Sequence, residues 1–333
     1  MEVDLHVTNR CNFRCKHCVY KSGEWSMPDM TLDTVKNLVD DFKEMGVEEV
    51  HITGGEPLLN PELFAIISTL RSNGFLVRIQ TNGMLINEET ADKLRDSGVQ
   101  HVLISIDGLK NSHNAFRRNE RSFDIAIQAS KICLKKGLFT RINTVIHKSN
   151  VSEIPYLIRF IKTLNVDQHS FFYLTPTGRG ESMKSEILSL EEWKNVQRSI
   201  IETAISEKIL DKIRVQDVYH ENDVHYNDFD ICRKDNCLIL ANGDVFHCVF
   251  FVYSNYKLGN IYKSSLSEIW KNLDNMIESI NNKRKKRCNN SYCGGGCPGM
   301  SFIIDGDVCD CDSRCQPEYN LISSCIRRYR TES

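Results

Sequence analysis

The sequence predicts an α/β fold, a partial (β/α)6 TIM-like barrel followed by a small Cys-rich C-terminal domain. Two observations support this prediction. From residue 2 to about 175, short apolar strands alternate with amphipathic helical stretches, which is the order of βα units in a parallel sheet. Beyond residue 229 the chain becomes rich in cysteine, glycine and turn residues, and ten of its 14 cysteines lie between 232 and 325.

Six strands are predicted, separated by roughly 25–35 residues, the length of a βα unit. We expect them at residues 3–7, 50–53, 76–80, 101–106, 141–146 and 170–174. Such units form a parallel sheet that curls into a partial or complete barrel. Functional groups are then expected at the C-terminal ends of the strands.

The segments between the strands show helical periodicity. Apolar residues recur at helical spacing over 35–45, and Gly46 suits a left-handed C-cap. A helix over 157–164 is expected to follow Ser152 as its N-cap and Pro155 in its first turn.

A charged stretch over 186–212 has one apolar face and is predicted to be a helical bridge between domains. The predicted domains are 1–185 for the barrel, 186–228 for the bridge and 229–333 for the Cys-rich domain.

Composition narrows the possible functions. The chain has 333 residues, 41% hydrophobic and 26% charged, with a formal net charge of -2, so nothing attracts it as a whole to nucleic acid or an anionic membrane. The basic run 283–287 is interpreted as a solvated helix end. No 18-residue apolar run and no signal peptide are visible, which predicts a cytoplasmic protein whose thiols stay reduced. Clustered cysteines are then expected to be metal or cluster ligands, whereas Cys133 fits an apolar helix face.

Three cysteines follow the first predicted strand. Cys11, Cys15 and Cys18 have the spacing C-x3-C-x2-C. Three thiolates can bind three irons of a 4Fe–4S cluster and leave the fourth iron open to a small molecule. The alternative is a zinc site completed by His17 or a distant residue.

The second predicted strand ends in Thr53-Gly54-Gly55-Glu56-Pro57. Together with the three cysteines, this segment resembles the radical S-adenosylmethionine (SAM) superfamily. The resemblance implies that the cysteines hold a 4Fe–4S cluster whose open iron binds SAM. It also implies SAM contacts from other residues: His17 and a backbone group near Leu174 for adenine, Gly54, Gly55 and Glu56 for the methionyl ammonium, Ser105 for the ribose or carboxylate, and Arg117, or its neighbour Arg118, for a carboxylate.

The Cys-rich segment contains Gly243-x4-Cys248, preceded by Cys232, and Cys293-Gly-Gly-Gly-Cys297. These elements resemble the SPASM domain of radical SAM enzymes that carry auxiliary Fe–S clusters, although one thiol of the usual pattern is missing. The resemblance implies two auxiliary clusters. We assign one to Cys232, Cys237, Cys248 and Cys297, and the other to Cys288, Cys293, Cys315 and either Cys309 or Cys311. Cys325 is left over, and structural zinc is the alternative for this domain.

The resemblance implies an enzyme that takes an electron from flavodoxin or ferredoxin and cleaves SAM to methionine and a 5′-deoxyadenosyl radical, which abstracts hydrogen from a C–H bond. The leading hypothesis for its substrate is a ribosomally made peptide or a protein, which would be crosslinked or oxidised under anaerobic conditions. No N-terminal leader-binding domain is visible, so a separate leader-peptide-binding protein is a candidate partner. Val249 stands where anaerobic sulfatase maturases have an Asp base, which argues against that activity.

Two alternatives stay open. Thr177–Gly180 is similar to a Thr-Gly-Arg-Gly segment of haem-pathway radical SAM proteins, which would act on a small molecule. A Zn- or Fe–S-binding scaffold is the non-enzymatic alternative. The candidates for a general acid or base are Tyr173, His147, His169 and His247. No catalytic residue is assigned among them.

Overall fold

The computed structural model describes residues 1–24, 26–216, 236–285 and 297–308. The chain divides into two compact units, residues 1–216 with 234–275, and residues 217–233 with 276–333. The domain boundaries expected from the sequence remain a prediction. No helix in the described part of the chain is both long enough and apolar enough to cross a membrane.

The first unit is built on a sheet of ten strands within the described residues, in the order β10-β9-β8-β1-β2-β3-β4-β5-β6-β7. The strands are β1 Glu2–His6, β2 Glu49–Thr53, β3 Leu76–Thr81, β4 His101–Ser105, β5 Phe139–Ile146, β6 Gln168–Tyr173, β7 Ile213–Val215, β8 Asn236–Ile239, β9 Asp244–Phe246 and β10 Gly259–Asn260. Strands β1 to β7 pair in parallel, and β8 lies parallel to β1 on its other side. The predicted parallel α/β fold with six repeated units is confirmed.

The α-helices of the described residues are α1 Leu32–Glu44, α2 Leu63–Ser72, α3 Glu88–Ser97, α4 Lys110–Arg117, α5 Ser122–Lys135, α6 Ile154–Thr163, α7 Leu190–Ser206, α8 Leu266–Trp270, α9 Asn272–Lys285 and α10 Pro298–Asp305. Helix α1 begins after Thr31, whose side chain accepts a hydrogen bond from the Thr34 amide. Helix α6 carries Pro155 in its first turn as predicted, but its N-cap is Glu153, because Ser152 lies in a preceding 3-10 turn. Cys133 is fully buried on α5, which confirms its prediction as a core residue.

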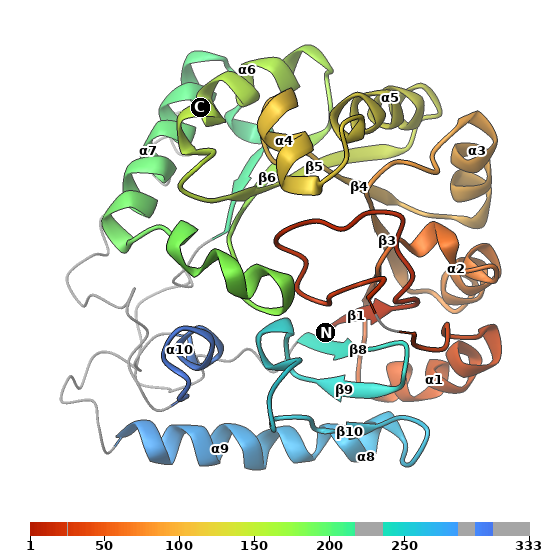
Figure 1. The fold of residues 1–333 in the computed structure, drawn as a ribbon. Helices are drawn as coiled ribbons and strands as arrows, with labels where there is room; N and C mark the ends of the chain where they lie inside the picture. Colours follow the sequence, from red (N-terminus) through yellow and green to blue (C-terminus); the bar gives the residue numbers. More distant parts are fainter. Residues whose placement is uncertain (25, 217–235, 286–296, 309–333) are drawn as a thin grey trace. The chain divides into compact units, whose positions relative to one another are not determined.

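The sheet has one apolar face and one polar face. Val3, Leu5, Val50 and Ile52 are fully buried on the apolar face, and Figure 1 shows α1, α2, α3, α5 and α6 along the outer side of the curved sheet. Because side chains alternate along a strand, the residues between these point to the inner side. We call this inner side the concave face. On β1 to β6 it carries Glu2, Asp4, His6, Glu49, His51, Thr53, Arg78, Gln80, His101, Leu103, Ser105, Arg141, Asn143, Val145, Ser170 and Phe172.

Candidate active site

The three N-terminal cysteines lie in the loop that leaves β1. Cys11 and Cys18 are partly exposed, Cys15 is buried, and none of them forms a disulfide. Burial raises the pKa of Cys11 to about 12, and charge on Cys15 and Cys18 acts in the same direction. The three thiols therefore lie within electrostatic reach of one another. A loop that holds three such thiols fits a metal cluster, because coordination favours the thiolates that burial alone disfavours.

Two arginines hold the backbone of this loop. The Arg14 guanidinium donates to the carbonyls of Cys11 and Phe13 at 2.8 and 2.9 Å. Arg179, which follows β6, donates its Nε to the Cys15 carbonyl at 2.8 Å and its amide to the Cys18 carbonyl at 2.9 Å. Sequence reasoning noted the segment around Arg179 but missed this role.

Gly178 allows the same segment to approach the cysteine loop. Its φ is +62°, and a Cβ there would lie 2.3 Å from the Val19 carbonyl oxygen. The Gly-Arg-Gly sequence at the end of a strand was the available signal for such a close approach.

The Gly-Gly-Glu segment after β2 contacts the chain just before Cys11. The Gly55 amide donates to the Thr8 carbonyl at 2.7 Å, and the Glu56 amide donates to the Arg10 carbonyl at 2.9 Å. A Cβ on Gly55 would lie 2.2 Å from the Arg10 oxygen. The Gly-Gly-Glu segment therefore packs closely against the chain that leads into Cys11, and the SAM contact that the resemblance implies for it stays a prediction.

Glu56 is fully buried between β2 and β3. Its carboxylate accepts from the Thr81 hydroxyl at 2.7 Å and from the amides of Asn82 and Leu58 at 2.9 and 3.3 Å. Burial raises the pKa of Glu56 to about 7, against the effect of these donors. Glu56 thus joins the ends of two neighbouring strands at the candidate site.

Arg117 ends α4 and is buried, whereas its neighbour Arg118 is exposed and has a φ of 53°. The Arg117 Nε donates to Asp107 at 2.6 Å, and the Arg117 Nη1 lies 3.8 Å from the Cys15 sulfur. Burial would raise the pKa of Asp107, but the Arg117 guanidinium outweighs it and holds that pKa well below its usual range. Of the two arginines that the sequence could not separate, the structure brings Arg117 to the cysteine loop.

His17 and Leu174 lie against the same side chain. The His17 ring stacks on Phe116 with centroids 4.1 Å apart and an interplanar angle of 3°, and Leu174 packs in a cluster with Phe116 and Met183. Burial lowers the pKa of His17 to about 3, so its ring is neutral. Its Nδ1 is buried and has no hydrogen-bond partner within the described part of the chain. Such an atom fits a site that a polar ligand completes.

Of the predicted auxiliary ligands, the structure describes Cys237, Cys248 and Cys297. Cys237 is fully buried on β8 in register with Val3, on the apolar face, which is the position of a core residue. Cys248 precedes a 3-10 turn over Val249–Phe251, and it acts with Cys18 to raise the pKa of Tyr20, which burial already raises. Cys297, in the other unit, is the N-cap of α10. The remaining predicted ligands, Cys232, Cys288, Cys293, Cys309, Cys311 and Cys315, lie outside the described residues.

The four candidate acids and bases all have local partners. His147 Nδ1 lies 3.4 Å from Glu186, and His169 Nε2 lies 2.9 Å from the Thr144 hydroxyl. Tyr173 donates to the Leu188 carbonyl, and His247 Nδ1 lies 3.2 Å from the Asn236 carbonyl oxygen. These contacts hold the fold together, and no catalytic residue is assigned among the four.

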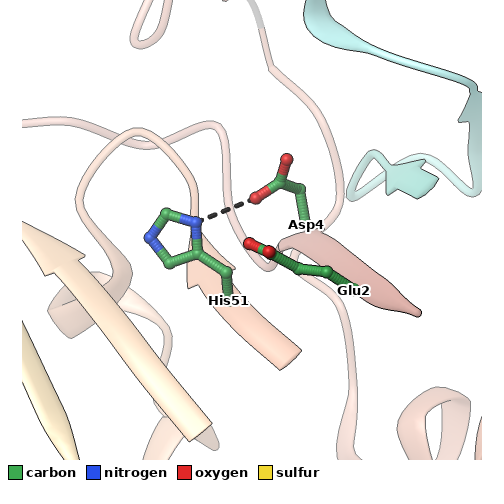
Figure 2. Close-up of side chains that lie close together, drawn as sticks. All are labelled: Glu2, Asp4 and His51. Atoms are coloured by element: carbon green, nitrogen blue, oxygen red, sulfur yellow. Dashed lines mark hydrogen bonds and ion pairs between the residues drawn. The ribbon is translucent and has the colours of Figure 1, made fainter. Parts of the chain in front are cut away.

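A second polar cluster lies on the concave face near the N-terminal ends of the strands. Figure 2 shows Glu2 and Asp4 of β1 beside His51 of β2, with Asp4 Oδ1 2.8 Å from His51 Nδ1. Arg78 of β3 forms ion pairs with Glu2 and with Glu49. The charge of Arg78 is therefore balanced by two carboxylates.

Two protein-family models match this chain, one over its N-terminal half and one over its Cys-rich segment. The model described as Radical SAM superfamily matches residues 5–161, and the SPASM model, described as an iron–sulfur cluster-binding domain, matches residues 231–298. Three curated relatives are similar over most of the chain. Fe-coproporphyrin III synthase of Methanosarcina barkeri is 27% identical over 84% of this chain and 76% of its own. AdoMet-dependent heme synthase of the same species is 27% identical over 93% and 94%. Mycofactocin maturase MftC of Mycobacterium tuberculosis is 25% identical over 92% and 81%.

Solved structures share the fold. SuiB of Streptococcus suis bound to S-adenosylmethionine superposes with a TM-score of 0.78 at 21% identity, covering 95% of this chain and 77% of SuiB. Native anSMEcpe with bound AdoMet superposes with a TM-score of 0.76 at 18% identity, covering 99% and 98%.

Proposed function

Because the chain is a radical SAM enzyme with a SPASM domain, we propose that it modifies a peptide or protein by abstracting hydrogen from a C–H bond. The cofactors of this class are SAM and Fe–S clusters. Cys11, Cys15 and Cys18 would hold the cluster that binds SAM. When bound, these groups supply the electron and the adenosyl radical that the reaction needs.

The observation that supports this most strongly is the construction of the cysteine loop. Arg179, Gly55 and Arg117 hold it from the ends of β6, β2 and α4. A loop fixed from three directions keeps its thiols in one arrangement, which a cluster requires. Glu56, Ser105, His17 and Leu174 would then contact SAM around this loop, as would Gly54, Gly55 and Arg117.

The substrate class rests on similarity. MftC is named a maturase, and one solved form of SuiB is bound to the precursor peptide SuiA. These relatives support a peptide or protein substrate. Two haem-pathway relatives at 27% identity support a small-molecule substrate as the second candidate.

The proposal includes further partners. A flavodoxin or ferredoxin would deliver the electron, and a separate leader-binding protein could present a peptide. The auxiliary clusters would lie on the distal cysteines, including Cys248 and Cys297. The thiol-rich composition, with 14 cysteines, supports a reducing cytoplasmic compartment.

Anaerobic reconstitution of the full chain tests the proposal. We expect about 12 irons per chain for three 4Fe–4S clusters, and 5′-deoxyadenosine from SAM and dithionite. Replacing Cys11, Cys15 and Cys18 by Ala should abolish that product, whereas Cys133→Ala, a core substitution on α5, should retain it. A fully loaded protein that forms no 5′-deoxyadenosine would contradict radical chemistry, and about four irons would contradict two auxiliary clusters.

A further inference from the structure

Two arginines of the concave face have different surroundings. Arg78 forms ion pairs with two carboxylates, Glu2 and Glu49. Arg141 of β5 is partly buried, and no ion pair joins it to any carboxylate in the described residues. Its Nε is buried without a hydrogen-bond partner. Burial, with Arg78 next in effect, lowers the pKa of Arg141 to about 10, so it still carries its charge at neutral pH. The charges of Glu2 and Glu49 act to raise that pKa, but neither carboxylate forms an ion pair with Arg141, and a partly buried charge without an ion pair is costly to the fold.

The direction of Arg141 is given by an aromatic contact. Its guanidinium carbon lies 5.6 Å from the centre of the Phe172 ring. Arg141 is in register with Gln168, so the side chain reaches along the sheet towards the C-terminal ends of the strands. It therefore extends past the next position on this face, where Asn143 and Ser170 are paired.

Asn143 and Ser170 each have a buried side-chain oxygen that accepts or donates no hydrogen bond within the described part of the chain. Asn143 is 7% exposed and Ser170 is 1% exposed, and both Asn143 Oδ1 and Ser170 Oγ are buried without a hydrogen bond in the described residues. Leaving such buried groups without a hydrogen bond is costly to the fold. The Asn amide can rotate to present its NH2 group at the same place. A guanidinium, an amide and a hydroxyl thus supply donors side by side, on the face where Ser105 is in register with Asn143.

We infer that Arg141, Asn143 and Ser170 bind a carboxylate group of the substrate on the concave face. A carboxylate fits because it accepts two hydrogen bonds from one guanidinium and neutralises its charge. The inference rests on the proposed function, since it supplies the substrate of that site. The carboxylate could belong to an acidic residue of a peptide or to a side chain of a tetrapyrrole, and the experiment distinguishes them.

Binding to the reconstituted full chain under anaerobic conditions tests the inference with two pairs of probes. One pair is iron coproporphyrin III and its tetramethyl ester. The other is the acetylated pentapeptide amide Ala-Ala-Glu-Ala-Ala and its Gln counterpart. We expect the wild type to bind at least one acid more tightly than its uncharged copy, by about 10-fold or more, which is the strength of a hydrogen bond to a charged group.

Arg141→Gln should remove this preference, and Asn143→Ala and Ser170→Ala should each weaken it by about 3–10-fold. A preference within the porphyrin pair alone assigns the carboxylate to a tetrapyrrole, and one within the peptide pair alone assigns it to a peptide. The inference fails if the wild type shows no preference in either pair, or if Arg141→Gln keeps it.

Thermal unfolding supplies a readout that needs no ligand. Arg141→Met should raise the Tm of the full chain, because it removes an unpaired charge. The matched variant Arg78→Met should lower it, because it leaves Glu2 and Glu49 without their counter-ion. An equal loss of Tm in both variants would show that Arg141 is structural and overturn the inference. Formation of 5′-deoxyadenosine by the same wild-type preparation keeps the two proposals separate, since its absence refutes the proposed function alone.

Discussion

The C-terminal edge of the sheet and its concave face are both polar, but they differ in how their buried charges are satisfied. At the edge, Arg117 binds Asp107, and Glu56 accepts three hydrogen bonds. On the concave face, Arg141 has no carboxylate partner in the described chain, and Asn143 and Ser170 present unpaired atoms. Satisfied buried groups fix a structure, whereas unsatisfied ones mark places that a ligand can complete. The comparison separates an edge where Asp107, Arg117 and Glu56 are satisfied within the chain from a face where Arg141 has no ion pair in the described residues.

The largest loss of stability is expected from replacing Arg117. Arg117→Met leaves the carboxylate of Asp107 buried without its counter-ion, and should lower the free energy of unfolding by about 3–5 kcal/mol. Urea denaturation measures this, and Arg118→Met on the exposed neighbour should change it by less than about 0.5 kcal/mol. Equal effects in the two variants would mean that the edge is no more dependent on its ion pair than the surface is.

A smaller loss of stability is expected from Gly55→Ala. The added Cβ would lie 2.2 Å from the Arg10 carbonyl oxygen, so the segment before Cys11 must move. We expect a loss of about 3 kcal/mol and a lower iron content after reconstitution. Gly46→Ala is a control, since nothing lies within 4 Å of a Cβ there, and only the left-handed φ of +67° is strained. Normal iron loading in Gly55→Ala would show that the cysteine loop does not need this close approach.

The stability of the fold is expected to depend on pH through His169, a buried histidine on the apolar face of the sheet. Burial lowers the pKa of His169 from 6.5 to about 3. The unfolded chain therefore binds a proton that the folded chain refuses, and stability present above pH 6.5 is lost as the pH falls towards 3. At pH 5 the loss is about 2 kcal/mol. Urea unfolding of His169→Phe and wild type between pH 7 and 5 should show a shallower pH dependence in the variant, and parallel curves would contradict the assigned burial.

The smallest change in stability is expected when either of two threonines, Thr81 or Thr53, is replaced by valine. Both end a strand, but the Thr81 hydroxyl of β3 donates to Glu56, while Thr53 Oγ1 of β2 points to the concave face and is buried without a hydrogen bond in the described residues. Thr81→Val should cost about 1–3 kcal/mol, and Thr53→Val should be neutral or stabilising. Thermal unfolding measures both. A larger loss for Thr53→Val would show that the concave face has partners of its own and would weaken the contrast drawn above.

The sequence predicted much of the fold and the first group of ligands. Strand periodicity placed β1 to β6 to within a residue or two of their observed ends, but it did not predict the parallel strands β7 and β8. Local signals failed where an atom's partner is distant in sequence. The paired glycines gave no local sign of the close approach of Gly55 to the Arg10 carbonyl, while their predicted SAM contact stays a prediction. Arg179 binds the cysteine loop from 164 positions away, and no local pattern reports such a contact.

By itself, the sequence determined the chemical class of this protein. Three spaced thiols, a Gly-Gly-Glu segment and a repeated βα pattern are local features, because each depends only on residues that are close together in the chain. The tertiary structure decided which charges are balanced. Arg78, Arg117 and Arg141 look alike in sequence. Register and burial give the first ion pairs with two carboxylates and the second a carboxylate and a thiol, whereas the third has no ion pair within the described residues. The energy of a buried charge depends on what surrounds it in space, and only folding brings those surroundings together.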